Sequence, residues 1–87
     1  MFRLLADKQF DKSAGLLPLS ARKKLADLLD VIRLDPFDSR AHTKPLEGQL
    51  KGIYSFRISR DWRVLFVFDD IETIRLIVVK HRKDIYR

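Results

Sequence analysis

Arg57, Arg63 and His81 are side chains whose types suit chemistry on an anion. A guanidinium is permanently charged and forms paired hydrogen bonds with a phosphate, and an imidazole can take up or release a proton near neutral pH. Tyr86, close to the end of the chain, could stack on a base or orient the phosphate. Further polar residues nearby are candidate contacts to an RNA backbone: Lys51, Ser55, Lys80, Arg82 and Lys83.

Three strands are predicted to position these side chains. The segments Ile53–Ile58, Trp62–Phe68 and Thr73–His81 are rich in β-branched and aromatic residues, and turn residues separate them. Consecutive strands joined by short turns form an antiparallel meander. The register of the strands then decides which residues share a face of the sheet.

The first hairpin is predicted to place Arg57 opposite Arg63, with a loop at residues 59–61. A slip by one residue would bring Arg63 beside Ile58 in the core, which burial of a charge disfavours. The preferred register builds one apolar face from these cross-strand pairs: Tyr54 with Phe66, Phe56 with Val64, and Ile58 with Trp62.

The second hairpin is predicted to pair Phe68 with Ile74, Phe66 with Leu76 and Val64 with Val78. Arg63 then lies across from Val79, with His81 one step further along and Asp61 facing it. The sequence therefore predicts a cluster at one end of one sheet face, made of Ser55, Arg57, Arg63 and His81.

The N-terminal part of the chain predicts one more strand and two helices. Phe2–Ala6 reads as a strand of the same sheet, and Asp7 is the expected N-cap of a short helix that ends at Gly15. A second helix begins near Pro18 and ends before Pro36. Its apolar residues recur every three or four positions, at Ala21, Leu25, Leu28, Leu29 and Ile32.

These elements predict an α+β fold in a single domain, residues 1–87, in the order β-α-α-β-β-β. A small, mostly antiparallel sheet of about four strands is expected to pack its apolar face on an N-terminal α-hairpin. Residues 35–52 show no sustained period and form a long loop for so small a domain, which favours a functional or partner-binding role. His42, within it, is interpreted as an exposed loop residue without a task.

The composition is basic, with 18 lysine and arginine residues against 12 acidic residues and a formal net charge of +6. Most of the excess lies in residues 51–87, which carry nine basic and five acidic groups. This bias favours a polyanionic partner such as nucleic acid, and the alternative is a solvated basic surface. The sequence shows no cysteine, signal peptide or membrane-spanning run, which predicts a cytoplasmic protein.

Several reaction classes lack their motifs here. The chain has no Gly-rich phosphate loop, HExxH, G-x-S-x-G or cysteine ligand set, so a reaction is expected to run without metal or cofactor. RNA supplies its own nucleophile, the 2′-hydroxyl, and a protein then only orients the attack, moves protons and stabilises charge on phosphorus. Each candidate also has a simpler interpretation: a shielded sheet face for Arg57 and Arg63, a surface position for His81, packing for Tyr86.

The chain resembles the RelE/ParE superfamily of toxins from bacterial toxin–antitoxin modules, and most closely the RelE branch. The resemblance covers nearly the whole chain and is carried by TKPLEGQLKG leading into YSFRISRDWRVLF, the acidic turn at Asp69 and Asp70, and the closing KHRKDIYR. It implies a compact sheet on an α-hairpin, similar to microbial ribonucleases. It also implies ribosome-dependent, metal-independent cleavage of messenger RNA that leaves a cyclic phosphate, and a cognate antitoxin that blocks it.

Matched to the family's motif, Arg57 and Arg63 fall where basic residues surround the scissile phosphate. His81 falls where an arginine or histidine donates a proton, and Tyr86 matches the terminal aromatic residue. Two positions depart from the pattern: Ser55 replaces a lysine of some relatives, and Arg57 replaces a lysine assigned as general base. Because an arginine stays protonated, the base is left open among His81, Lys51 and groups of the substrate or ribosome.

Two other functions fit the same sequence. A ParE-like inhibitor would bind DNA gyrase and cleave nothing, and it would share the fold. A non-catalytic nucleic-acid-binding domain would bind RNA with a steep salt dependence and produce no cut ends. The basic cluster with His81 favours the nuclease.

Overall fold

The computed structural model describes residues 1–86, and Arg87, the last residue of the basic C-terminal segment, lies outside them. The helices and strands match the predicted ones to within two residues at their ends. In chain order they are β1 (Arg3–Ala6), α1 (Lys8–Gly15), α2 (Leu19–Leu34), β2 (Lys44–Pro45), β3 (Tyr54–Arg57), β4 (Trp62–Asp70) and β5 (Thr73–His81). Short 3-10 turns lie between α2 and β2 at Ser39–Ala41 (η1), between β2 and β3 at Gly48–Leu50 (η2), and after β5 at Arg82–Asp84 (η3).

Within residues 1–86 the strands form one five-stranded sheet in the order β1-β5-β4-β3-β2. β1 pairs with β5 in parallel, and the pairs from β5 to β2 are antiparallel. The predicted α+β fold and the place of the first strand in the sheet are confirmed. The sequence did not predict strand β2. It has only two residues, one of them a proline without an N–H, and so short a segment shows no strand pattern.

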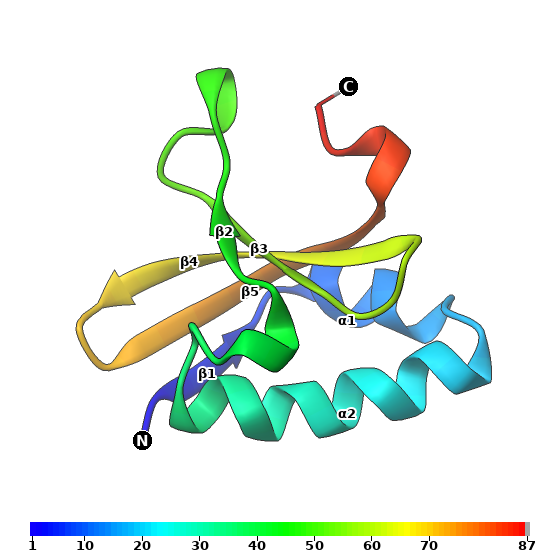
Figure 1. Cartoon of the computed structure of the whole chain (residues 1–87), viewed down its shortest axis with the longest axis horizontal. Coiled ribbons are helices and arrows are strands. Elements are labelled where there is room, and N and C mark those ends of the chain that lie inside the picture. Colours follow the sequence, from blue (N-terminus) through cyan, green and yellow to red (C-terminus); the bar gives the residue numbers. More distant parts are fainter. Residues whose placement is uncertain (87) are drawn as a thin grey trace.

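Both helices lie on one face of the sheet (Figure 1). Helix α2 buries the predicted apolar stripe except Leu29, which is half-buried, and the stripe joins Phe56, Val64 and Phe66 of the sheet in one core cluster. Each fully buried aliphatic side chain stabilises the fold by roughly 1.5–3 kcal/mol. Pro18 occupies the N-cap of α2, and Asp35, in extended geometry before Pro36, ends the helix as predicted.

Asp7 occupies the N-cap position of α1, but its side chain makes no capping hydrogen bond. Its Oδ1 instead accepts a hydrogen bond from Arg75 of β5 at 3.0 Å. Arg75 also binds Asp69 at the end of β4, with 2.9 Å between its Nε and Oδ2 of Asp69. The hydrogen bonds to Asp69, and then those to Asp7, raise the pKa of Arg75. Arg75 therefore connects the start of α1 to strands β4 and β5.

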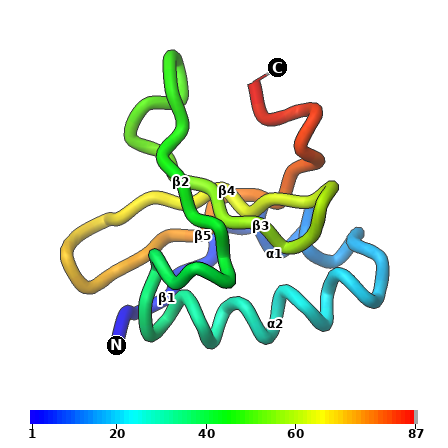
Figure 2. The backbone as a smooth tube through the Cα atoms, viewed as in Figure 1, coloured from blue at the N-terminus to red at the C-terminus, as the bar shows by residue number. Residues whose placement is uncertain are grey.

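The sheet face away from the helices carries a second apolar cluster. Leu65 of β4 and Val78 of β5 pack there against Leu46 and Ile85. The segment between β2 and β3 and the C-terminal segment both rise over this face (Figures 1 and 2). The cluster therefore anchors both segments to the sheet and gives this face two raised walls.

The first hairpin has the predicted register, with Arg57 opposite Arg63. In the second hairpin the pairs of Phe68 with Ile74 and of Phe66 with Leu76 are confirmed, but the predicted pairing of Val64 with Val78 is wrong. A bulge follows Leu76, so Val64 pairs with Val79 and Arg63 faces Lys80 rather than Val79. The extra residue in β5 reverses the alternation of faces beyond that point.

Candidate functional site

Three cationic side chains form a row across the sheet at the end near the β3–β4 loop. Arg57, Arg63 and Lys80 are cross-strand neighbours in β3, β4 and β5, and we call them the cationic row. Cross-strand neighbours point to the same face with their Cβ atoms roughly 5 Å apart. Like charges so placed repel one another, so an anion bound among them relieves that repulsion and is itself stabilised.

The backbone of the β3–β4 loop holds Arg63. Its Nη1 atom donates hydrogen bonds to the carbonyl oxygens of Ser59 at 2.6 Å, Arg60 at 2.9 Å and Trp62 at 3.2 Å. Two of these contacts are partly buried. The guanidinium is therefore fixed before any ligand arrives, which lowers the entropy lost on binding.

Asp61, in the same loop, lies among the cationic groups. Its Oδ1 is 3.5 Å from Nε of Arg82 and 4.0 Å from Nε2 of His81. Burial, followed by the charges of Arg57 and Arg82, lowers the pKa of Arg63, and the charge of Asp61 opposes this shift. One carboxylate thus lies within electrostatic range of the cationic row and of His81.

His81 lies on the opposite sheet face from the one that the sequence predicts. It pairs with Trp62, and the two ring centroids are 5.2 Å apart. Trp62 packs against the core on the helix side, so His81 emerges on that side and not beside Arg63. The predicted gathering is therefore confirmed for the two arginines and wrong for His81, and the bulge in β5 is the cause. Because His81 ends β5, its imidazole still reaches Asp61 at the rim of the sheet.

The other predicted RNA contacts differ in exposure. Ser55 is only 1% exposed, which leaves its side chain no access to an RNA strand and overturns that prediction. Lys80 is half-buried within the cationic row, whereas Arg82 is exposed. Lys51, at the end of η2, and Lys83, in η3, are exposed on the two segments that rise over the sheet face.

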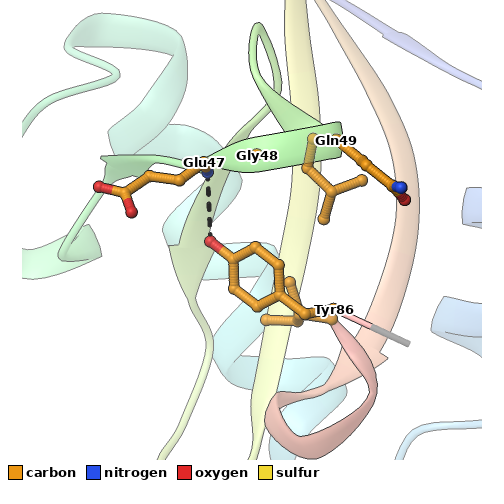
Figure 3. Close-up of a pocket in the computed structure, with 6 residues that line it drawn as sticks. Glu47, Gly48, Gln49 and Tyr86 are labelled. Atoms are coloured by element: carbon orange, nitrogen blue, oxygen red, sulfur yellow. Dashed lines mark hydrogen bonds between the residues drawn. The ribbon is translucent and has the colours of Figure 1, made fainter.

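A cavity of about 550 Å³ lies between the tip of the β2–β3 segment and the C-terminal turn (Figure 3). Leu50 and Ile85 give it an apolar wall, and Glu47, Gln49 and Tyr86 complete the lining. The hydroxyl oxygen of Tyr86 accepts a hydrogen bond from the backbone N–H of Glu47 at 3.3 Å. Tyr86 is 64% exposed, so its ring is available to stack on a nucleobase that enters the cavity.

Trp62, Glu47 and Gln49 receive no role from the sequence. The unusual length of the loop at residues 35–52 could have indicated a role for Glu47 and Gln49. No sequence signal indicates the contact of Trp62 with His81, because that contact depends on the bulge in β5. Among residues 1–86 no three histidine or acidic side chains gather in a way that could hold a metal ion. No helix in that range is long and apolar enough to cross a membrane.

A five-stranded mixed sheet covered on one face by two helices is the fold of the RelE/ParE toxins, because solved YoeB/ParE and RelE toxins share it. The model of one family, the YoeB-like toxin of bacterial type II toxin–antitoxin systems, matches residues 19–83. The chain therefore belongs to the YoeB-like toxins, and the resemblance read from its sequence is confirmed.

Solved structures share the fold at low sequence identity. The YoeB/ParE toxin from Agrobacterium tumefaciens superposes with a TM-score of 0.80 at 18% identity, over 93% of this chain and 99% of that one. A chain of the RelE–RelB complex from Pyrococcus horikoshii gives 0.78 at 23% identity, over 95% and 97%. A chain of the YoeB–YefM complex from Staphylococcus aureus gives 0.74 at 20% identity, over 92% and 95%. A search of curated protein sequences finds no significant match.

Proposed function

We propose that this toxin is an endoribonuclease that cleaves messenger RNA on the ribosome, in the cytoplasm and without a metal ion. The observation that carries the proposal is the cationic row, whose Arg63 is fixed in advance by backbone carbonyls. The titratable group His81 stands at the rim of the same end of the sheet. Membership of the YoeB-like toxin family supports the same activity.

In the proposed reaction the 2′-hydroxyl of the RNA attacks the adjacent phosphorus. Arg57 and Arg63 stabilise the negative charge that develops on the phosphate oxygens, and His81 donates a proton to the leaving 5′-oxygen. Tyr86 positions a nucleotide in the cavity. The RNA backbone is contacted by the remaining exposed and half-buried cations, Lys51, Lys80, Arg82 and Lys83. The products are a 2′,3′-cyclic phosphate and a 5′-hydroxyl end.

A cognate antitoxin is the proposed protein partner. Two solved structures that share the fold are complexes whose names pair RelE with RelB and YoeB with YefM. We expect an antitoxin to block this toxin, so co-expression of the antitoxin is expected to restore growth of cells that express the toxin.

The test is cleavage of messenger RNA on purified, programmed ribosomes, followed by chemical analysis of the new ends. We expect the parent protein to leave 2′,3′-cyclic phosphates, whereas attack by a metal-bound hydroxide would leave a linear phosphate monoester. Arg57→Ala is expected to lower the cleavage rate by about 100-fold or more. Arg22→Ala removes the same charge from the exposed side of α2 and is expected to cleave like the parent.

Two other outcomes would overturn the proposal. Inhibition of purified DNA gyrase without any cut messenger RNA would identify a ParE-like inhibitor. Salt-dependent RNA binding without cut ends would identify a non-catalytic binding domain.

A further inference from the structure

We infer, on the basis of the proposed ribonuclease function, that a cavity between the start of α2 and the β3–β4 loop is a second RNA subsite, which stacks one nucleobase on Trp62. The cavity has a volume of about 230 Å³ and lies apart from the one beside Tyr86. Pro18, Ser20, Ala21 and Lys24 line it from α2, and Ser59, Asp61 and Trp62 line it from the β3–β4 side.

The β3–β4 loop connects this cavity to the cationic row. Ser59 and Trp62 line the cavity, and the backbone carbonyls of the same two residues accept hydrogen bonds from Arg63. Trp62 and Arg63 are consecutive in β4, so their side chains lie on opposite faces of the sheet. The loop lies at the same end of the molecule as the start of α2 (Figures 1 and 2). An RNA strand with a phosphate at Arg63 can therefore continue round the edge of the loop into the cavity.

Apolar groups on both sides of the cavity suit a flat base. Trp62 lies on the loop side, and Pro18 and Ala21 lie on the side of α2. Every nucleobase has a π-face that stacks on an aromatic ring. Trp62 packs partly against the core, and its ring contacts His81 edge-to-face at 5.2 Å between centroids. The indole is thus held in place before RNA arrives, which lowers the entropy lost on stacking.

The size of the cavity favours a nucleobase over a protein segment. A stable protein partner covers roughly 800 Å² of surface on each side, whereas this cavity holds about one ring system. Its position beside the cationic row also makes it continuous with the surface that the RNA backbone is proposed to follow.

The polar residues at the rim suit the rest of the nucleotide. Lys24 and Ser20 are exposed and Ser59 is half-buried, and among residues 1–86 no hydrogen bond or ion pair engages these three side chains. The ammonium of Lys24 is available to a phosphate, and the hydroxyls are available to the sugar or the base edge. Asp61 is the acidic group of the rim, and Arg82, with its Nε 3.5 Å from Oδ1, offsets its charge.

The first experiment uses fluorescence. Trp62 is the only tryptophan of the chain, so its emission reports on this cavity alone. The probe is a short, labelled adenosine oligonucleotide with methylated 2′-hydroxyls, which cannot be cleaved, and anisotropy of the label measures its binding. We expect the bound probe to quench Trp62. Ser20→Leu fills the cavity from an exposed position and is expected to abolish the quenching and weaken binding about tenfold. Ser39→Leu makes the same change at an exposed serine outside the cavity and is expected to match the parent.

The second experiment uses messenger RNA on programmed ribosomes, with one nucleotide near the cut replaced by an abasic one. At one position we expect the loss of the base to raise KM of the parent about tenfold and to leave kcat nearly unchanged. Ser20→Leu should show the raised KM on intact RNA and no further rise at that position.

Three results would overturn the subsite: no quenching of the parent by the probe, quenching that Ser20→Leu leaves unchanged, or an abasic effect that is equally large in Ser20→Leu. The proposed nuclease activity fails separately. If the probe quenches Trp62 but the parent cuts no messenger RNA, the cavity still binds a base and the ribonuclease assignment is wrong.

Discussion

Trp62 and His81 face each other across β4 and β5, with ring centroids 5.2 Å apart and ring planes at 80°. This edge-to-face contact fixes the imidazole from the helix side of the sheet. We predict that Trp62→Ala lowers the free energy of unfolding by about 2 kcal/mol, below the cost for a fully buried ring because Trp62 is half-buried. Urea denaturation measures this change, and proton NMR should show that the His81 ring resonances lose the shift caused by the indole. Trp62→Phe should keep most of both, and unchanged His81 resonances in Trp62→Ala would contradict the contact.

Alanine substitutions of the two arginines of the cationic row are predicted to have similar effects on cleavage but different effects on stability. Arg57 is exposed and its loss should change the free energy of unfolding by less than about 0.5 kcal/mol. Arg63→Ala should destabilise the protein by about 1–2 kcal/mol, because loop carbonyls lose their donor. Urea denaturation of both variants checks this, and both should lose cleavage. Equal stabilities would show that the carbonyl contacts of Arg63 contribute little.

Tyr86→Phe is predicted to loosen the C-terminal segment without removing the aromatic ring. The variant loses the acceptor for the N–H of Glu47, so exchange of that amide hydrogen should become roughly fivefold faster. The amide of Leu46, which donates to the carbonyl of Ile53 at 2.9 Å, serves as an internal control and should keep its rate. Hydrogen exchange followed by NMR measures both. Equal acceleration at the two amides would mean that the whole hairpin has loosened.

Acid should weaken the fold through Asp38. Its carboxylate accepts hydrogen bonds from the backbone N–H and side chain of Arg40, at 2.9 and 3.0 Å. The side-chain bond and then the backbone bond lower the pKa of Asp38 from 3.8 to about 2. Because the folded state binds this proton more weakly than the unfolded state, the stabilisation is complete above pH 3.8 and is lost as the pH falls through about 2. Urea midpoints measured between these values should fall less steeply in Asp38→Asn than in the parent.

The fold follows from the sequence largely because helix α2 has one apolar side and the apolar residues of β3 alternate with polar ones. The alternation in β3 and the first half of β4 permits only the register in which Arg57 meets Arg63. The helix boundaries follow from Pro18 and Pro36, whose effect on the backbone is local. These parts needed no knowledge of distant contacts.

The position of His81 could not be predicted because it depends on a bulge in an apolar run. Leu76, Ile77, Val78 and Val79 are all hydrophobic, so the residues themselves do not indicate where the strand gains its extra residue. Each sheet face has its own apolar cluster, one around Val79 and one around Val78, so both faces accept an apolar side chain there. The cavity beside Tyr86 was also beyond prediction, because irregular loop residues line it.

The parallel pairing of β1 with β5 has a consequence for how the toxin is made. Arg3 lies in register with Thr73, so β1 has no strand partner until residues 73–76 have also been synthesised. Lys80 and His81, at the end of β5, emerge later still. A nascent chain that stops short of β5 therefore has neither a strand partner for β1 nor the third member of the cationic row.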